Sequence, residues 1–598
     1  MITAKLSAKL LLIIIVLSIM TTGAEVQDGI VRGDIGRRLD TYLSGAEASG
    51  YSGVVLVAKG GRIVLQKGYG FADRDRGVLF TASTRFPLAS IDKTFTAAAI
   101  LKLEQQGKLK TTDSITSYFD PVPEDKKIIT IHHLLTHSAG LPSYSGKDEE
   151  LISRDTLVER MMNVKLKSEP GTKFSYSNPS YSLLAVIVER VSGQSFEAFV
   201  QNQLFRPAGM KQTSYEVTNR DRALLPCGYS SWHDECKPLD SATRLPDGGR
   251  TWNLRGNAGR WTTALDLYRW HLALKNKKIL SAESKRKAVA PYIKTSSSGT
   301  NSYGYGWFVT TTPRGTRLIH HSGGDQTVAA NFRRFADEDV VIVEFTNNAW
   351  GPYRRVREET NKIAFGGEPS LLPAPRVKLT RSSLQSLAGS YQLPSGEKFT
   401  IAVKNNRLIV PLDVPGAAKL FTRFADSENH NLSRDVESKI SRLLGGFSRD
   451  DFEPLRELQW RELKFDEERK FWADTWREWT KKHGEYKGAE TVGAIAGTNS
   501  TAPGVKLLDT YVLVHFERGR EILNFQQNPE GRFFIGYNST YLLPAYYQLV
   551  PLSKTEFAAY NFMLQTSSPI RFQINNAGIV AGLVLQDDEG DISAKKIN

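Results

Sequence analysis

The chain has 598 residues, with 78 lysine and arginine residues against 64 aspartate and glutamate residues and a formal net charge of +14. This length exceeds what one hydrophobic core supports, so we expect two to four domains. The basic residues are scattered, without a long basic run or a nucleic-acid motif, which excludes nucleic acid as an expected partner and leaves non-specific attraction to anionic surfaces.

A short apolar segment opens the chain. Lys5 and Lys9 precede an apolar run over residues 10–20, and residues 22–24 are the small residues that a signal peptidase prefers. The run is too short for a comfortable membrane span, and no later segment reaches about 18 uninterrupted apolar residues. We therefore predict a signal peptide over residues 1–24, export to the periplasm or the medium, and no membrane span after cleavage.

The first half of the mature chain places strand patterns around a helical region. Residues 54–59 and 62–69 predict two strands around a Gly-Gly turn, and an Ala-rich helix follows Ser90. Strands return later, and a helix over residues 353–364 ends this half. The pattern predicts an α+β fold over residues 25–365, in which an antiparallel sheet is flanked by helices and joined by a helical subdomain.

A Gly/Pro-rich linker, residues 366–380, separates this half from a β-rich one. Residues 381–429 and 541–598 predict one β-barrel-like module, with a hairpin turn at residues 575–578. Residues 430–540 interrupt the module with three helical stretches followed by alternating strands, which predicts an α+β insertion.

A stripe of three tryptophans lies on the last of these helices, at positions i, i+4 and i+7: Trp472, Trp476 and Trp479. This spacing places the three rings on one helix face, which is more often helix core than an aromatic binding platform. We predict the core, and the platform is the alternative.

Only two cysteines occur, Cys227 and Cys236, nine positions apart. In an exported protein such a pair predicts a disulfide that closes a short loop, with two free thiols as the alternative. His233 lies nearby, but the set lacks a fourth ligand at zinc spacing, so we predict no metal.

Ser90 and Lys93 stand at i and i+3 at the start of the Ala-rich helix and therefore share one face. A serine hydroxyl needs a nearby base before it becomes a good nucleophile, and a neutral, desolvated lysine is one such base. The alternative is that Ser90 only caps the helix, with Asp92 favourably placed in its first turn.

Tyr176 and Asn178 lie in a polar loop just before a strongly apolar helix. A tyrosine close to ammonium groups has its phenolic pKa lowered, so Tyr176 is a candidate general base toward Ser90. Asn178 can donate to a substrate carbonyl and contact Lys93.

A strand ending in His321, Ser322, Gly323 and Gly324 supplies a further candidate segment. Glycines at a strand end let a substrate backbone approach closely, and an exposed N–H there can serve an oxyanion. Three other histidines lack the acidic residue of a zinc-protease motif and are predicted to be structural: His132, His133 and His137.

The order S-x-x-K, then Y-x-N about 85 residues on, then H-S-G about 145 residues after that resembles the serine β-lactamase-related, penicillin-binding-protein-like hydrolases. The connecting sequences "ITIHHLLTHSAGLPSY", "PGTKFSYSNPSYSLLAVIVERVSGQSF" and "GNAGRWTTALDLYRW" resemble the branch of class C β-lactamases, D,D-peptidases and esterases. The resemblance covers roughly residues 30–365 and implies the β-lactamase/transpeptidase-like fold. The C-terminal barrel resembles the lipocalin-like appendage of some members.

The resemblance implies a role for each motif residue. Ser90 would be the acylated nucleophile, Lys93 its proton partner and Tyr176 the base for acylation and deacylation. Asn178 would orient the substrate amide, and the backbone N–H groups of Ser90 and Gly324 would form the oxyanion hole. His321 and Gly323 would line the substrate site. No metal or cofactor is implied.

Two positions depart from the family pattern. Asp92 stands where small residues are usual, and should face away from the nucleophile. His321 replaces the lysine of K-[ST]-G and is mostly neutral at pH 7, which lowers the expectation of efficient β-lactam hydrolysis and favours esterase or D-peptidase activity.

The sequence thus predicts an exported serine hydrolase that forms an acyl-enzyme with an ester or amide. Its expected partner is a small-molecule or peptide substrate, for example one derived from peptidoglycan. The alternative is a catalytically silent sensor or scaffold that binds peptidoglycan, although a pure binder has no need of the whole Ser/Lys/Tyr/Asn/His set. The natural substrate, the role of the C-terminal modules and the oligomeric state are left open.

Overall fold

The computed structural model of the chain describes residues 29–48, 50–148, 150–217, 225–229, 236–239, 251–276, 278–296, 300–325, 327–349, 353–371, 377–404, 406–411, 434–459, 464–498, 506–528, 530–536, 546–561, 566–586 and 591–597. The predicted signal peptide, residues 1–24, lies outside the described residues. Among the helices that are described, none is long and apolar enough to cross a membrane.

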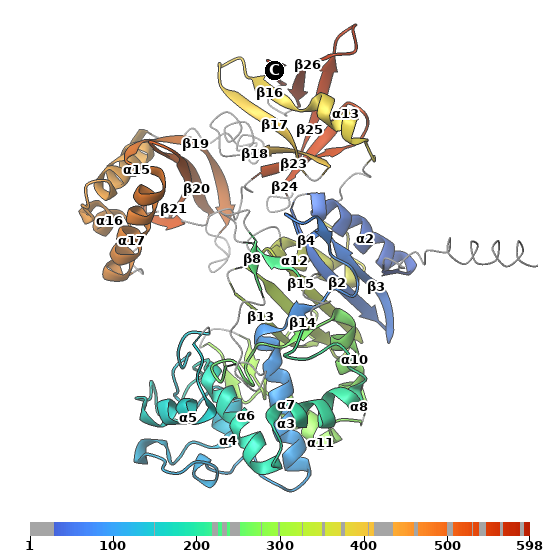
Figure 1. The fold of residues 1–598 in the computed structure, drawn as a ribbon, viewed down its shortest axis with the longest axis vertical. Coiled ribbons are helices and arrows are strands. Elements are labelled where there is room, and N and C mark those ends of the chain that lie inside the picture. Colours follow the sequence, from blue (N-terminus) through green and yellow to red (C-terminus); the bar gives the residue numbers. More distant parts are fainter. Residues whose placement is uncertain are drawn as a thin grey trace, which may run out of the picture.

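A nine-stranded antiparallel sheet forms the centre of the N-terminal half (Figure 1). The two ends of this half meet in it, because β2 (Gly53–Lys59) pairs with β15 (Val340–Thr346). β3 (Arg62–Tyr69) extends the sheet on one side, and β14 (Ala329–Phe335) and β13 (Arg317–Gly324) extend it on the other. Shorter strands complete the edges: β1 (Ile30–Val31), β12 (Phe308–Thr311), β11 (Ser302–Tyr303) and β10 (Ile293–Lys294). The predicted α+β fold is confirmed.

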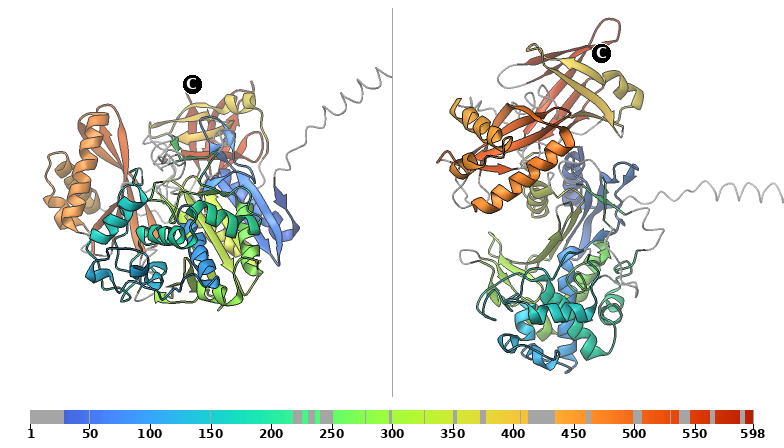
Figure 2. Two further views of the ribbon diagram at one scale, coloured as in Figure 1. Left: turned by 60° about the horizontal axis from the view of Figure 1, so that its bottom comes forward. Right: turned by 60° about the vertical axis from the view of Figure 1, so that its left-hand side comes forward.

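Helices cover both faces of the sheet, as the turned views show (Figure 2). Alternate residues of β2 serve the two cores, Val55 and Val57 on one face and Val54 and Leu56 on the other. The first core includes α2 (Gly33–Ala48) and α12 (Tyr353–Ala364). The second includes α3 (Lys93–Gln105), α4 (Ile131–Leu135), α5 (Arg154–Asn163), α6 (Asn178–Ser192), α7 (Phe196–Val200), α10 (Ala264–Lys275) and α11 (Ala282–Ala288).

Helix α3 is buried from Lys93 to Leu101, as its apolar composition predicts. Alanines let neighbouring elements approach its backbone closely, and α6 packs along it. The Phe95 ring anchors the helix, with its centroid 4.8 Å from that of Phe205 and 5.0 Å from that of Trp270. This packing fixes the start of α3, where Lys93 lies.

The C-terminal half contains a closed eight-stranded barrel. Its strands in order around the barrel are β16 (Gly389–Gln392), β17 (Lys398–Lys404), β18 (Arg407–Pro411), β23 (Tyr546–Pro551), β24 (Glu556–Asn561), β25 (Thr566–Ile574), β26 (Val580–Leu585) and β27 (Ile592–Lys596). β27 pairs with β16 and closes the ring. Five aromatic side chains of its described strands are buried in its core: Tyr391, Phe399, Tyr547, Phe557 and Phe572.

Between β18 and β23 the chain forms an α+β unit, two residues of which, Tyr511 and Leu513, are buried in the barrel core. Its elements are α15 (Arg434–Phe447), α16 (Glu453–Leu458), α17 (Phe465–His483) and a sheet of β19 (Tyr486–Thr498), β20 (Lys506–Phe516), β21 (Arg520–Gln527) and β22 (Phe533–Gly536). Trp472, Trp476 and Trp479 are buried in one core with Val512 and Val514 of β20. The tryptophan stripe is therefore helix core, and the alternative of a binding platform is wrong.

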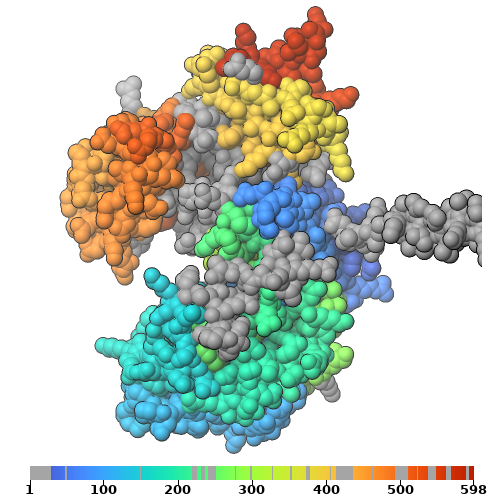
Figure 3. Space-filling view, in the orientation of Figure 1, coloured from blue at the N-terminus to red at the C-terminus, as the bar shows by residue number. Residues whose placement is uncertain are grey.

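The barrel contacts the N-terminal half next to α2. Arg407 of β18 forms an ion pair with Glu47, and its guanidinium lies 5.2 Å from the centroid of the Phe71 ring. Val550 and Ala558 of the barrel join the core formed by α2 and α12. In the space-filling view the barrel, in yellow and red, covers this end of the N-terminal half (Figure 3). The two halves therefore share apolar contacts beyond the linker.

Candidate active site

Ser90 lies on a short 3₁₀ turn, Ala89–Asp92, directly before α3. Neither the turn nor α3 has a side-chain N-cap, so the structure does not support the alternative in which Ser90 only caps the helix. Ala89 has a positive φ of 44°, which costs about 1 kcal/mol or more for an L-residue and is found where the surroundings hold the backbone. The hydroxyl of Ser90 is thus carried by a strained, well-supported turn.

Strand β13 supports this turn from the side. A Cβ at Gly323 would lie 2.5 Å from the carbonyl oxygen of Leu88 and 2.7 Å from the backbone nitrogen of Ser90. Only glycine permits that approach, because a side chain would collide with main-chain atoms that cannot move aside. The sequence therefore needs glycine at position 323 to bring the end of β13 against the Ser90 backbone.

Lys93 is fully buried and reaches Ser90. Its Nζ donates to Ser90 Oγ at 2.9 Å and to the carbonyl oxygen of Asn257 at 3.1 Å. Burial lowers the pKa of Lys93 to about 7, although the nearby carboxylates of Asp92 and Asp148 oppose that shift. At neutral pH a large fraction of Lys93 is therefore uncharged and can accept a proton.

Tyr176 also hydrogen-bonds Ser90, but its ionisation differs from the expectation. Burial raises the pKa of Tyr176 well above its ordinary value, and the hydrogen bond to Ser90 only partly offsets this. The Lys93 Nζ lies 5.0 Å from the centre of the Tyr176 ring. The prediction of a lowered phenolic pKa is therefore wrong: burial outweighs the hydrogen bond to Ser90, the pKa of Tyr176 is raised, and its hydroxyl stays neutral at physiological pH.

His137 packs beneath Tyr176. The two ring centroids are 4.2 Å apart, and His137 Nδ1 accepts a hydrogen bond from the Ser177 backbone at 3.1 Å. Burial and the nearby Lys93 hold the pKa of His137 well below its usual range. These contacts agree with a structural role, in which His137 supports the loop that carries Tyr176.

Asn178 begins helix α6 and lies beside the site. Its backbone N–H donates to the carbonyl oxygen of Ser143 at 3.0 Å, and its side-chain oxygen is buried without a hydrogen-bond partner in the described part of the chain. No hydrogen bond joins its side chain to Lys93 among the described residues. The main-chain carbonyl of Asn257 accepts a hydrogen bond from Lys93 instead, a contact that no sequence motif predicts.

His321 lies under the site with only 2% of its surface exposed. Its Nδ1 is 2.6 Å from the Ser322 carbonyl oxygen, which can only accept, so Nδ1 carries the proton and Nε2 accepts from Tyr303 Oη at 3.0 Å. Burial and Lys93 lower the pKa of His321 to about 3, so the ring is neutral. Both nitrogens are used inside the protein, and Ser322 is the exposed side chain at this point of β13.

Asp92 points into the protein and meets a partner that sequence reasoning missed. Arg260 Nη1 lies 2.5 Å from Asp92 Oδ1, and the two side chains are 2% and 0% exposed. The Arg260 guanidinium also lies 4.1 Å from the centroid of the Tyr215 ring, and its backbone carbonyl accepts from the Leu88 N–H at 2.8 Å. The pair thus joins the Ser90 turn to the segment that holds Lys93.

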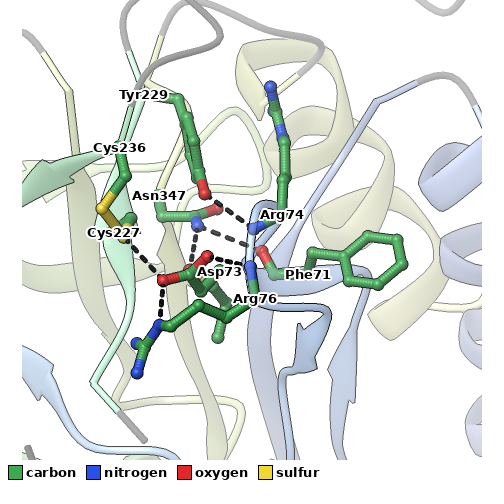
Figure 4. The surroundings of a disulfide bond; sticks show 9 residues. Phe71, Asp73, Arg74, Arg76, Cys227, Tyr229, Cys236 and Asn347 are labelled. Carbon is green, nitrogen blue, oxygen red and sulfur yellow. Dashed lines mark hydrogen bonds and ion pairs between the residues drawn. A yellow bond between two sulfur atoms is a disulfide. The ribbon is translucent and has the colours of Figure 1, made fainter. Parts of the chain in front are cut away.

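The two cysteines form a disulfide (Figure 4). It joins β7 (Cys227–Gly228) to the residue before β8 (Lys237–Pro238). The Asp73 carboxylate lies 3.1 Å from Cys227 Sγ and accepts from Arg76 Nε at 2.6 Å. Since the disulfide uses both sulfurs, this group offers a metal ion only one carboxylate. His233, considered above as a ligand, lies outside the described residues.

The chain is similar in sequence to several penicillin-binding proteins. The chain is 27% identical to penicillin-binding protein 4* of Bacillus subtilis over 66% of this chain and 90% of that protein. It is 30% identical to the putative penicillin-binding protein PbpX of the same organism, over 48% of this chain and 69% of that protein. A solved penicillin-binding protein from Bacillus halodurans is 28% identical over 54% of this chain and 98% of its own, with a TM-score of 0.44.

A family model described as β-lactamase matches residues 39–364, which is more than half of the chain. The match contains every strand of the sheet except β1, the Ser90 turn and Tyr176, and it stops before the barrel. The chain therefore belongs to the β-lactamase family of serine hydrolases.

Proposed function

We propose that this protein is an exported serine hydrolase that cleaves an ester or an amide through a covalent acyl-enzyme on Ser90. The observation that carries the proposal is the 2.9 Å contact between Ser90 Oγ and the buried Lys93, whose pKa is lowered to about 7. A buried amine that is half neutral at physiological pH is a suitable general base for a hydroxyl nucleophile.

In acylation, neutral Lys93 takes the proton of Ser90 while Oγ attacks the acyl carbonyl carbon. The bond to the leaving alcohol or amine then breaks, and the leaving group needs a proton. Tyr176 supports this step as a neutral hydroxyl that bonds Ser90 and can pass on the proton held by Lys93. We therefore assign the base to Lys93 and the proton relay to Tyr176, which reverses the roles expected from the sequence.

The developing oxyanion would be stabilised by the backbone N–H groups of Ser90 and Gly324. The close approach of Gly323 to the Ser90 nitrogen supports this assignment, because it brings the end of β13 against the nucleophile turn. Deacylation would run the same steps in reverse, with a water in place of the leaving group and Lys93 again as base.

The charge of the site bears on the substrate. His321 is neutral, with its ring nitrogens bonded internally, so it offers no fixed positive charge to a substrate carboxylate. This supports an uncharged acyl donor, an ester or a D-amino-acid amide, over a β-lactam or a peptide with a free C-terminal carboxylate. A peptidoglycan-derived peptide would be cleaved at an amide bond and is therefore one of the proposed substrates. The similarity to penicillin-binding proteins supports export.

The test is to trap the acyl-enzyme. Purified protein is mixed with p-nitrophenyl butyrate, quenched with acid, digested with trypsin and analysed by mass spectrometry. The peptide over residues 86–93, FPLASIDK, contains Ser90 as its only hydroxyl residue, so an added butyryl group on it identifies the nucleophile without ambiguity. Esters, D-alaninamide and a chromogenic cephalosporin are then compared as substrates.

Ser90→Ala should abolish both the adduct and turnover, and the exposed Ser83→Ala serves as the matched control with full activity. An adduct on another peptide, or activity in Ser90→Ala, would overturn the mechanism. An adduct on Ser90 that never turns over with any of these substrates would instead support the silent acyl-binding sensor.

A further inference from the structure

A cavity of about 180 Å³ lies between helices α3, α10 and α11 and strands β13 and β14. Apolar side chains make much of its wall, among them Ala98, Leu274, Trp307 and Ile319. Neither Ser90 nor Tyr176 lines it. The cavity is therefore distinct from the candidate active site, although both adjoin α3.

Basic side chains line the same cavity: Lys285, Arg317 and Arg334, with no carboxylate among the described lining residues. Lys285 donates to the carbonyl oxygens of Lys275 and Asn276, and Arg317 lies 3.6 Å from Asp337 at the surface. These two cations are thus partly satisfied elsewhere.

Arg334 has no such counter-ion. Within the described residues it forms no ion pair, and its Nε donates to His271 Nδ1 at 3.2 Å. Burial and the neighbouring Arg317 lower the pKa of Arg334 to about 10. Arg334 is half-buried, and its guanidinium also lies 5.4 Å from the centroid of the Trp307 ring. It is thus a cation beside the cavity that has no carboxylate partner among the described residues and could pair with an anion there.

Two buried polar groups strengthen the case. The Thr94 hydroxyl and the Trp270 indole N–H belong to residues that are 1% and 0% exposed, and neither finds a hydrogen-bond partner in the described part of the chain. Both residues line the cavity. Buried donors are normally satisfied, so an acceptor that reached them from the cavity would pair two donors that lack a partner in the described part of the chain.

We propose that this cavity is a second ligand site that takes a small carboxylic acid with an apolar, ring-sized body. The carboxylate would pair with Arg334 and accept from Thr94 and Trp270, while the apolar wall holds the ring. The size agrees, because an apolar cavity of about 150 Å³ takes up benzene. A guanidinium is also the side chain best suited to a planar carboxylate.

The experiment is isothermal titration calorimetry of the full chain with benzoate, and with benzyl alcohol as the uncharged analogue. We expect a Kd on the order of 1 mM for benzoate, and at least tenfold weaker binding of benzyl alcohol. Arg334→Gln should weaken benzoate binding at least tenfold and Arg334→Lys should recover part of it. The exposed Arg354→Gln on α12 is the matched control and should leave binding unchanged.

Two variants that keep the side-chain shape provide a second test in case Arg334→Gln does not fold. Thr94→Val and Trp270→Phe each remove one donor and should each weaken benzoate binding severalfold, with the Tm measured alongside. Anomalous diffraction from crystals soaked with 4-bromobenzoate should place the bromine in this cavity. Absence of benzoate binding, equal binding in Arg334→Gln or in both donor variants, or bromine only at Ser90 would overturn the proposal.

Discussion

The interior of the N-terminal half and the interior of the barrel are built on opposite principles. Beneath the Ser90 turn the protein buries Lys93, Asp92 and Arg260. The described part of the barrel buries aromatic and aliphatic side chains and no charged one. Charged groups in a core cost stability, and proteins keep them where chemistry needs them. The comparison places buried charged groups beneath the Ser90 turn and none in the described part of the barrel core.

The largest expected effect is on activity. Lys93→Met should lower kcat/KM by about 10³-fold or more, on the scale of a lost general base, because Ser90 then has no group to take its proton. The same change should raise the Tm, since it removes a buried amine and leaves a side chain of similar length. Ester hydrolysis and thermal unfolding of the two proteins measure both.

Lys108→Met, at an exposed position just after α3, is the control and should change neither quantity appreciably. A Lys93→Met protein that keeps its activity would remove the distinction between the two interiors, because the buried charge would then serve no chemistry.

The second effect is on stability within the N-terminal half. Asp92→Asn leaves Arg260 charged and buried without its partner, which should lower the free energy of unfolding by about 4 kcal/mol. Urea titration followed by circular dichroism measures the change. Asp435→Asn breaks an exposed pair with Lys439 and should cost less than about 1 kcal/mol. An equal decrease in the free energy of unfolding for Asp92→Asn and Asp435→Asn would contradict the conclusion that burial makes the Asp92–Arg260 pair the more important one.

The third prediction concerns the barrel. Phe572→Ala should lower the free energy of unfolding of the barrel by about 3 kcal/mol, because it leaves a cavity in an apolar core. Activity at Ser90 should stay within a factor of about two, since no group of the proposed mechanism lies in the barrel. Phe471→Ala, at a position 45% exposed, is the control for stability. A large loss of activity in folded Phe572→Ala would show that the barrel contributes to the site.

Much of this organisation could be predicted from the sequence, because it depends on patterns within short segments of the chain. The i, i+3 spacing of Ser90 and Lys93 and the period of the tryptophan stripe depend only on helix geometry. Two apolar runs on either side of a Gly-Gly turn similarly predicted β2 and β3. Such patterns are readable before any tertiary contact is known.

The features of the site that the sequence did not predict depend on contacts between segments that are far apart in the chain. Lys93 meets the Asn257 carbonyl 164 residues away, and Asp92 meets Arg260 168 residues away. A contact made by a main-chain carbonyl cannot be recognised from residue type. A buried arginine cannot be distinguished from an exposed one in the sequence until its partner is known. The pKa of Tyr176 was mispredicted for the same reason, because burial is set by packing and not by neighbours in sequence.

The smallest expected effect is the pH dependence of kcat/KM, and it best distinguishes the N-terminal half from the barrel. Lys93 acts as a base only when neutral, and its pKa is about 7. Below pH 7 the neutral fraction falls tenfold per pH unit, so kcat/KM should fall by about the same factor, and above about pH 8 it should level off. Tyr176, with its raised pKa, should add no second ascending limb in this range.

Tyr176→Phe makes the test specific. If the hydroxyl relays a proton and Lys93 is the base, the variant should lower the plateau of kcat/KM and leave the midpoint near pH 7. If Tyr176 were the base as a phenolate, the ascending limb would disappear in the variant. Unfolding of the barrel, followed over the same pH range, should show no transition near pH 7, because the described part of its core holds no charged side chain to titrate there. A shared midpoint would mean that the two interiors are coupled.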